Sequence, residues 1–469
     1  MDREAFIVIS IISASEIVDM DALLELPISY KGRMIGKKSI RKIILRLIDL
    51  GIFESMPKGF LNEESYRRLE ENSRMTIKWP AYTHLSAPET VHWALTYKCG
   101  EDCPDCYMER HKREFTSELN TQEAFKLIDK ISDAEVFQLA IGGGEPFLRD
   151  DLEALAAYAH KKGLVTHITT GRYEIESRRL QELSKYIKVL QIGIKTEELL
   201  NSNAKTNEKL KALVAQLNEF NIITGANLIM TGSTIKNLDY IMEVLLELGF
   251  KRFTFLRYKP PVKVGRWLKE KPYKDDIWLL ENKLDKLKEN EKLHIRIDCA
   301  FAFLQRELSQ QIAEDSGFKG CTAGERIISL APDGSVFPCS QLTGASFNAG
   351  NLLIDDFDTI WNKSSILKKY RGFRTNKSFK NDDCGKCTVK NFCGGCRVFA
   401  SDAIGSDPGC PDPLYEDKYI DEENDVIAEI QDDIGYTDAG FPYARREDIE
   451  KWLEEENDRG YPAWINSTR

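Results

Sequence analysis

Cys99-Gly100-Glu101-Asp102-Cys103-Pro104-Asp105-Cys106 places three thiols in the spacing Cys-x3-Cys-x2-Cys. Thiolates are the usual ligands of iron–sulfur clusters, and three of them in one short loop can hold three corners of a cubane cluster. The fourth iron would then have no protein ligand and could bind a small chelating molecule. Because a structural metal site normally has four protein ligands, we expect a cluster with one open iron here.

Two other interpretations of this loop are open. His111, five residues after Cys106, could complete a zinc site, or the three thiols could be unrelated buried residues. A second motif favours the cluster: Gly142-Gly143-Gly144-Glu145-Pro146 directly follows the strand-like run 136–141. Such a glycine-rich turn is common in α/β proteins and is weak evidence alone. It becomes informative because it comes one strand–helix unit after the three cysteines.

Together these motifs resemble those of the radical S-adenosylmethionine (radical SAM) superfamily. The resemblance implies a 4Fe–4S cluster whose open iron binds the amino and carboxylate groups of SAM, and reductive cleavage of SAM to a 5′-deoxyadenosyl radical. The cluster ligands would be Cys99, Cys103 and Cys106. Residues at the ends of the second, third and sixth strands would contact SAM, namely Gly143, Gly144, Glu145, Thr170 and Arg257. For Arg257, a salt bridge at the barrel rim is an equal alternative.

From Thr90 onward, strand-like and helical patterns alternate at the spacing of βα units, which predicts an α/β fold with a parallel sheet. Six units predict a partial (β/α)6 barrel of the TIM type, with function at the C-terminal ends of its strands. Asn120 and Glu123 predict a capping box at the first helix after the cysteine loop. The expected strands are 92–97, 136–141, 165–169, 189–194, 222–230 and 252–258.

A second group of cysteines follows in a different rhythm. Cys321 and Cys339 flank a hairpin turn at Pro332-Asp333-Gly334. The later run Cys384-x2-Cys387-x5-Cys393-x2-Cys396 could be a zinc ribbon when taken alone. With Cys410, the seven thiols resemble the SPASM extension of radical SAM enzymes, which carries two auxiliary iron–sulfur clusters. The resemblance assigns Cys384, Cys387, Cys393 and Cys410 to an outer cluster, and Cys321, Cys339 and Cys396 to an inner one.

The inner set has only three thiols, and the interval between the last two cysteines of the run is two residues where relatives have three. Either Cys299 completes the inner set, or one iron is open to substrate. The open or externally ligated iron is the preferred interpretation. An open iron would suit a substrate thiolate, because sulfur ligands are soft.

The expected domain order is a winged-helix-like domain at 1–75, a linker at 76–90, the radical SAM core at 91–300, the SPASM domain at 301–415 and an acidic tail at 416–469. Helical periodicity at 38–50, ending at Gly51, supports the first of these. Such a domain could dock a leader peptide or partner, cap the structure, or bind DNA. We expect peptide docking.

Charge argues against general nucleic-acid binding. The chain has a net charge of −10, but residues 411–469 carry 18 acidic and 6 basic residues, which leaves the rest near +2. Eleven cysteines indicate metal or redox chemistry. We see no signal peptide and no apolar run long enough to span a bilayer, so no membrane partner and a cytoplasmic location are expected.

By resemblance in domain order, we expect a radical SAM oxidoreductase that modifies a ribosomally synthesised peptide, most plausibly by forming an intramolecular Cys thioether. A flavodoxin- or ferredoxin-type protein would supply electrons. The catalytic residues beyond the cluster ligands are unknown. Three alternatives are open: formylglycine formation in a sulfatase, modification of a small molecule or tetrapyrrole, and a metal-containing winged-helix DNA-binding regulator.

Overall fold

The computed structural model describes residues 84–100, 117–201, 204–259, 264–290, 292–305, 319–380, 383–400 and 405–411, together with Cys103, Cys106 and short pieces near both ends. The chain forms two compact units, Met1–Thr83 with Leu308–Phe318, and His84–Glu307 with Lys319–Arg469. The second, called the main unit below, contains all eleven cysteines.

Only a few residues of the first unit are described. Strands β1 (Ser29–Tyr30) and β2 (Arg33–Met34) pair antiparallel. Ile40 and Ile44 lie in helical conformation and are buried, as the amphipathic pattern predicts. The rest of the predicted winged-helix-like domain and most of the predicted linker lie outside the described residues. So does the acidic tail, apart from the antiparallel pair β13 (Gly435–Tyr436) and β14 (Pro442–Tyr443).

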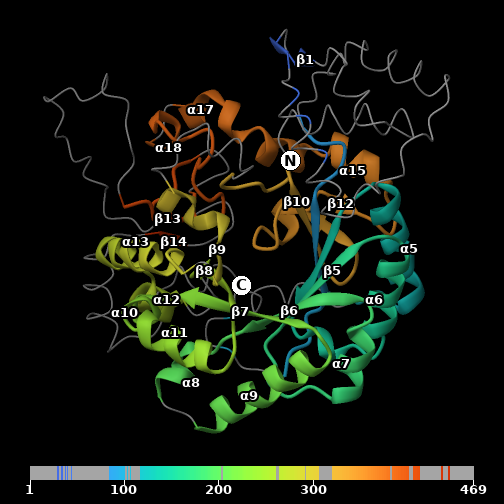
Figure 1. The fold of residues 1–469 in the computed structure, drawn as a ribbon. Helices are drawn as coiled ribbons and strands as arrows, with labels where there is room; N and C mark the ends of the chain where they lie inside the picture. Colours follow the sequence, from blue (N-terminus) through green and yellow to red (C-terminus); the bar gives the residue numbers. More distant parts are fainter. Residues whose placement is uncertain are drawn as a thin grey trace, which may run out of the picture. The chain divides into compact units, whose positions relative to one another are not determined.

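The main unit is built on a curved sheet with helices along its outer side (Figure 1). The six predicted strands are confirmed, with ends that differ from the prediction by two residues or fewer. They pair in parallel in sequence order. Their bounds are β3 Thr90–Thr96, β4 Gln138–Gly143, β5 Val165–Thr170, β6 Ile187–Gly193, β7 Ile223–Met230 and β8 Arg252–Arg257.

The sheet continues beyond these six strands at both ends. Strand β9 (His294–Ile297) pairs in parallel with β8, and β10 (Ile327–Leu330) pairs in parallel with β3. The predicted hairpin is confirmed: β10 turns into β11 (Ser335–Phe337), which pairs antiparallel with β10 and with β12 (Gly350–Asn351). The cysteine-rich C-terminal part is therefore joined to the barrel by a continuous sheet.

The helices of the main unit cover the outer side of the sheet or form the C-terminal cysteine-rich part. On the sheet lie α5 Thr121–Asp133, α6 Leu152–Lys161, α7 Ser177–Leu183, α8 Thr196–Leu200, α9 Ala204–Glu219, α10 Gly232–Lys236, α11 Leu238–Glu247, α12 Val264–Glu270 and α13 Lys274–Lys288. In the C-terminal part lie α15 Phe357–Lys363, α16 Ser365–Arg371, α17 Lys377–Lys380 and α18 Asp383–Lys386.

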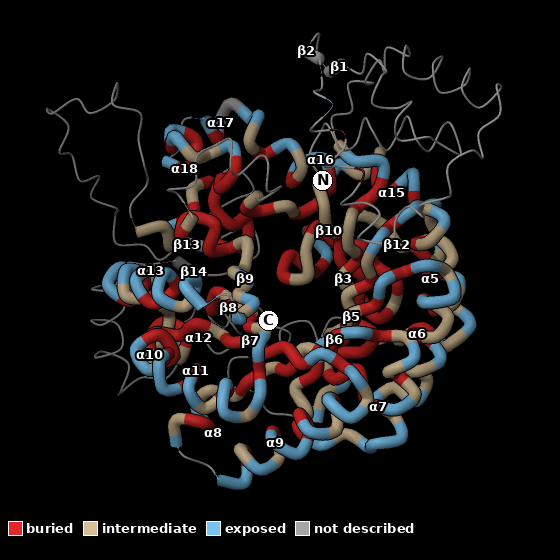
Figure 2. The backbone as a smooth tube through the Cα atoms, viewed as in Figure 1, coloured by how far each residue is buried: buried red, intermediate tan, exposed pale blue. Residues whose placement is uncertain are grey.

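Helix α5 shows how the local sequence specifies these elements. Its predicted capping box is confirmed: the Asn120 side chain accepts from the backbone of Glu123, and the Glu123 carboxylate accepts from the Asn120 N–H at 2.9 Å. Leu127, Ile128 and Ile131 form its buried face. The same division, with buried strands and half-buried helices, holds across the barrel (Figure 2).

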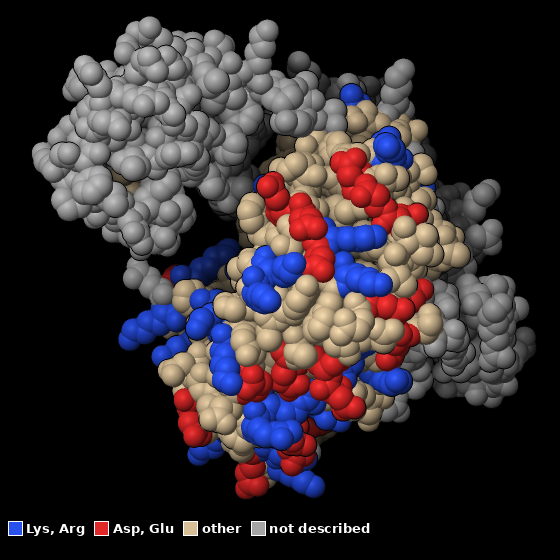
Figure 3. Space-filling view, turned by 90° about the vertical axis from the view of Figure 1, so that its right-hand side faces the viewer, with Lys and Arg blue, Asp and Glu red and all other residues tan. Residues whose placement is uncertain are grey.

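Charges of both signs are interspersed on the side of the main unit where α5, α6 and α7 lie (Figure 3). Ion pairs join neighbouring elements there, for example Arg179 with Glu153 at 2.5 Å. Among the described helices, none combines the length and the apolar character that crossing a membrane requires.

Candidate active site

The first cysteine loop begins three residues after β3 ends, at the C-terminal end of a barrel strand. Cys99, Cys103 and Cys106 are partly exposed, and the Cys106 N–H donates to the Cys103 carbonyl at 3.1 Å. Cys106 also packs against the buried cluster that contains Cys321 and Cys396. Cys106 therefore adjoins the buried cluster to which the barrel and the C-terminal cysteine-rich part both contribute.

The glycine-rich motif lies directly against the start of this loop. The Gly144 N–H donates to the Thr96 carbonyl at 2.7 Å, and the Glu145 N–H donates to the Lys98 carbonyl at 2.9 Å. A Cβ at Gly143, whose φ is +110°, would lie 2.5 Å from the Thr96 oxygen, and a Cβ at Gly144 would overlap the Lys98 oxygen. Glycine is needed at both positions because the two backbones touch. The two motifs that the sequence singled out are therefore held together by backbone hydrogen bonds.

The Glu145 carboxylate is buried and bonded to its own protein. It accepts from the Phe147 N–H, the Thr170 hydroxyl and the Gly171 N–H, each at 3.0 Å. Burial raises the pKa of Glu145, and these donors partly offset that effect. Glu145 therefore fixes the turn after β5. The SAM contacts expected from Gly143, Gly144, Glu145 and Thr170 stay predictions.

Arg257, at the end of β8, lies against the C-terminal part of the chain. Its guanidinium donates to both carboxylate oxygens of Asp407, at 2.6 and 2.9 Å, and to the Ala300 carbonyl at 3.1 Å. Arg257 therefore forms a salt bridge, the alternative that the sequence offered to a SAM contact. The pair with Asp407 is buried. A SAM contact from Arg257 also stays a prediction. Sequence reasoning missed Asp407, whose only local signal is the turn Asp407-Pro408-Gly409 before Cys410.

The cysteines expected at the outer cluster come from α18 and the segments that follow it. Cys384, Cys387 and Cys393 are buried, and Cys410 is partly buried. The Asp407 N–H lies 3.3 Å from the Cys384 sulfur, and the Cys410 N–H donates to the Asp407 carbonyl at 3.3 Å. Asp407 therefore links the segment of Cys410 to Cys384, and the assignment of these four cysteines to one cluster stays a prediction.

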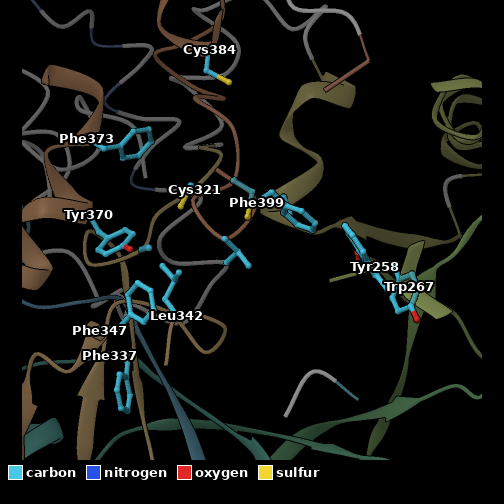
Figure 4. Packing of buried hydrophobic residues seen from close by; sticks show 14 of the residues in the cluster. Tyr258, Trp267, Cys321, Phe337, Leu342, Phe347, Tyr370, Phe373, Cys384 and Phe399 are labelled. Carbon is cyan, nitrogen blue, oxygen red and sulfur yellow. The ribbon is translucent and has the colours of Figure 1, made fainter. Parts of the chain in front are cut away.

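The cysteines expected at the inner cluster lie in a cluster of buried aromatic and aliphatic side chains (Figure 4). Cys321 and Cys396 belong to it, and Cys339 packs against it. Arg374 ties this region to the outer set, because its guanidinium donates to the Cys321 carbonyl at 3.1 Å and to the Cys393 carbonyl at 2.9 Å.

The short interval between Cys393 and Cys396 is a turn of two glycines. Gly394 and Gly395 have φ of +66° and +69°, the left-handed region that other residues rarely adopt. A Cβ at Gly395 would lie 2.7 Å from the Asp407 Cβ and 3.0 Å from the Cys384 sulfur. The short interval is therefore formed by two left-handed glycines, with Gly395 packed closely against the side chains of Asp407 and Cys384.

Cys299, the spare thiol, begins the 3-10 helix η3 (Cys299–Gln305) after β9. Burial raises its pKa well above the ordinary value, and the negative charges of Asp298, Cys396 and Cys321 raise it further. The residue after Cys299 is tied to the inner set through Arg257, which donates to the Ala300 carbonyl and to Asp407, the acceptor of the Cys396 N–H.

The donors of this region suit a soft metal. Burial raises the pKa of Cys339 to about 11 and that of Cys393 to about 12, and it raises the pKa values of Cys384 and Cys396 as well. Buried thiols bind as thiolates only when a cation compensates their charge, which iron does in a cluster. Among the described residues, no three His, Cys, Asp or Glu side chains lie close enough to hold one metal ion.

Residues 93–248 match the radical SAM superfamily, and residues 321–388 match the SPASM iron–sulfur cluster-binding domain. The AdoMet-dependent heme synthase of Nitratidesulfovibrio vulgaris is 23% identical over 348 residues, which cover 68% of this chain and 91% of that protein. The mycofactocin maturase MftC of Mycobacterium tuberculosis is 26% identical over 70% of this chain and 83% of its own. Streptococcus suis SuiB, solved with its precursor peptide SuiA, has a TM-score of 0.59 at 18% identity, over 81% of this chain and 90% of SuiB.

Proposed function

Because the chain carries a radical SAM domain and a SPASM domain, we propose that it modifies a ribosomally synthesised precursor peptide by forming an intramolecular Cys thioether. The observation that carries the proposal is the extent of the likeness to SuiB, a protein solved with a precursor peptide, which covers 81% of this chain. The matched domains begin at residue 93, and a separate compact unit, Met1–Thr83 with Leu308–Phe318, is available to hold the peptide.

The radical SAM domain takes a 4Fe–4S cluster and SAM as cofactors, and the SPASM domain takes auxiliary iron–sulfur clusters. The first cluster supplies the electron that cleaves SAM and so starts radical chemistry on the substrate. We assign Cys99, Cys103 and Cys106 as its ligands. Gly143 and Gly144 let the turn after β4 hold the start of that loop, and Glu145 fixes the turn that carries Thr170.

Two auxiliary clusters would receive the electron that the substrate radical must lose before its carbon bonds to sulfur. The outer ligands are proposed to be Cys384, Cys387, Cys393 and Cys410. A flavodoxin- or ferredoxin-type donor, a cytoplasmic location and the absence of nucleic-acid and membrane partners belong to the same proposal.

We propose Cys299 as the fourth ligand of the inner cluster, with Cys321, Cys339 and Cys396. From the sequence, an open iron is the preferred interpretation and ligation by Cys299 is the alternative. We adopt the alternative here because the segment beside Cys299 is tied to Cys396. Arg257 holds both Ala300, the neighbour of Cys299, and Asp407, which accepts from the Cys396 N–H at 2.9 Å. With the inner cluster closed, the substrate thiol would lose its proton and bond to the oxidised carbon without first binding to iron.

Cys299→Ala is therefore expected to lower the iron content and change the EPR spectrum of the reduced inner cluster, because one iron loses its ligand. Cleavage of SAM without substrate, measured as 5′-deoxyadenosine, should stay within about twofold of the wild type, since the first cluster is untouched. Unchanged iron content and an unchanged spectrum would restore the open-iron interpretation.

A tetrapyrrole is the second candidate substrate, because heme synthases are among the relatives. The two candidates are separated by incubating the anaerobic enzyme with SAM, dithionite and the Cys-bearing peptide encoded beside its gene. We expect the peptide to lose a pair of hydrogen atoms per crosslink and its Cys to resist alkylation, measured by mass spectrometry. Conversion of iron coproporphyrin III in place of the peptide would overturn the peptide proposal.

A further inference from the structure

One buried ion pair lies between the barrel and the cysteine-rich part. Arg257 and Asp407, 150 residues apart, form a bidentate pair whose side chains are 7% and 0% exposed. Bidentate, charge-assisted pairs of this kind are strong and fix geometry. Removing two charged groups from water costs free energy. A purely structural link between the two parts would therefore not require a buried ion pair.

Asp407 contacts both proposed sets of auxiliary ligands. Its carboxylate accepts from the Cys396 N–H at 2.9 Å, on the inner side. Its own N–H points at the Cys384 sulfur at 3.3 Å, and its carbonyl accepts from the Cys410 N–H at 3.3 Å, both on the outer side. One residue therefore reaches ligands of both clusters.

Arg257 supplies the opposite charge in equally dry surroundings. Its guanidinium stacks on the Phe399 ring at 3.7 Å, and a Cβ at Gly409 would overlap it. The charges of the pair therefore act on the neighbouring sulfurs with little screening by water. Reduction potentials of iron–sulfur clusters depend on such charges and hydrogen bonds near the sulfurs.

We propose that Arg257 and Asp407 are positioning residues that form an electrostatic bridge between the two auxiliary clusters and hold their reduction potentials at working values. The inference rests on the ligand sets of the proposed function. It does not depend on the identity of the substrate.

The sign of each effect follows from charge. Asp407→Asn removes a negative charge and leaves Arg257 uncompensated, which favours the reduced cluster and makes its potential more positive. Arg257→Gln leaves Asp407 uncompensated, which makes the potential more negative. Arg257→Lys keeps the charge, so its cluster potential should stay near the wild-type value. In the double variant Asp407→Asn with Arg257→Gln, the potential should return toward the wild-type value.

The test is an EPR-monitored redox titration of the full-length protein, with Cys99, Cys103 and Cys106 replaced by alanine so that only auxiliary clusters contribute. We expect the two single variants to shift in opposite directions, each by at least a tenfold change in the oxidised-to-reduced ratio, which is 59 mV for one electron. Glu153→Gln, in the ion pair on α6 and α7, is the matched control and should leave the potentials unchanged.

Iron analysis of the same proteins decides between electrostatics and mere packing. The inference would be overturned, and the pair would be only a structural link, in any of three cases. Both single variants could shift the potential in the same direction, neither could shift it, or both could lose auxiliary iron. Opposite shifts, together with failure of the protein that keeps Cys99, Cys103 and Cys106 to crosslink the peptide, would sustain the bridge and reject the proposed substrate instead.

Discussion

Cys103→Ala is expected to reduce 5′-deoxyadenosine formation from SAM on the order of 10³-fold or more, to the level seen without enzyme. On the proposed assignment the three thiolates act as one unit, since each would hold a different iron and the fourth iron would stay free for SAM. Removing one leaves the cluster with too few ligands to persist. Cys99→Ala and Cys106→Ala should have the same effect. The measurement is chromatography of the products after anaerobic incubation with SAM and dithionite.

Metal analysis of the Cys103→Ala protein provides the control. Because the auxiliary ligands are elsewhere in the chain, the variant should lose about one cluster's share of iron and keep the rest. Cys299→Ala, with an intact first loop, should still cleave SAM. Full SAM cleavage by Cys103→Ala, or zinc with a complete ligand set at this loop in the wild type, would refute the assignment of the first cluster.

The sequence predicts best what local periodicity and spacing determine. The alternation of strands and helices from Thr90 locates all six barrel strands, and Asn120 with Glu123 predicts the start of α5. The hairpin at Asp333-Gly334 follows from turn chemistry in the same way. In each case, the information lies within a few residues of the element.

Contacts between residues far apart in the sequence leave no such local signal. Nothing in Ile327–Leu330 indicates that this short strand pairs with β3, more than 200 residues earlier. The pairing of Arg257 with Asp407 is equally invisible in the sequence, so a salt bridge could be weighed there against a SAM contact but its partner could not be named. The link between the segment of Cys299 and Cys396 depends on the same contacts. The motifs therefore predict the chemistry. The tertiary structure shows which side chains, such as Arg257, are already bonded to other groups of the protein.

Gly144→Ala is expected to lower SAM cleavage by at least about tenfold, even though residue 144 is not a proposed cluster ligand. A Cβ there would overlap the Lys98 carbonyl oxygen, which is backbone and cannot rotate away. The chain would have to separate at this contact, which breaks the hydrogen bonds from Gly144 to Thr96 and from Glu145 to Lys98. Overpacking of this kind costs about 1–3 kcal/mol, and here it would displace the residues directly before Cys99.

Gly142→Ala is the matched control, because a Cβ at Gly142 has no heavy atom within 4 Å. Both variants add one methyl group to the same glycine-rich motif, so any general effect of losing a glycine is shared. We expect Gly142→Ala to cleave SAM within about twofold of the wild type and to unfold at nearly the same temperature. If both variants behaved alike, the contact between the glycine-rich turn and the cysteine loop would not matter for activity. A selective loss in Gly144→Ala would show that the loop's position, and not only its three thiols, makes the first cluster competent.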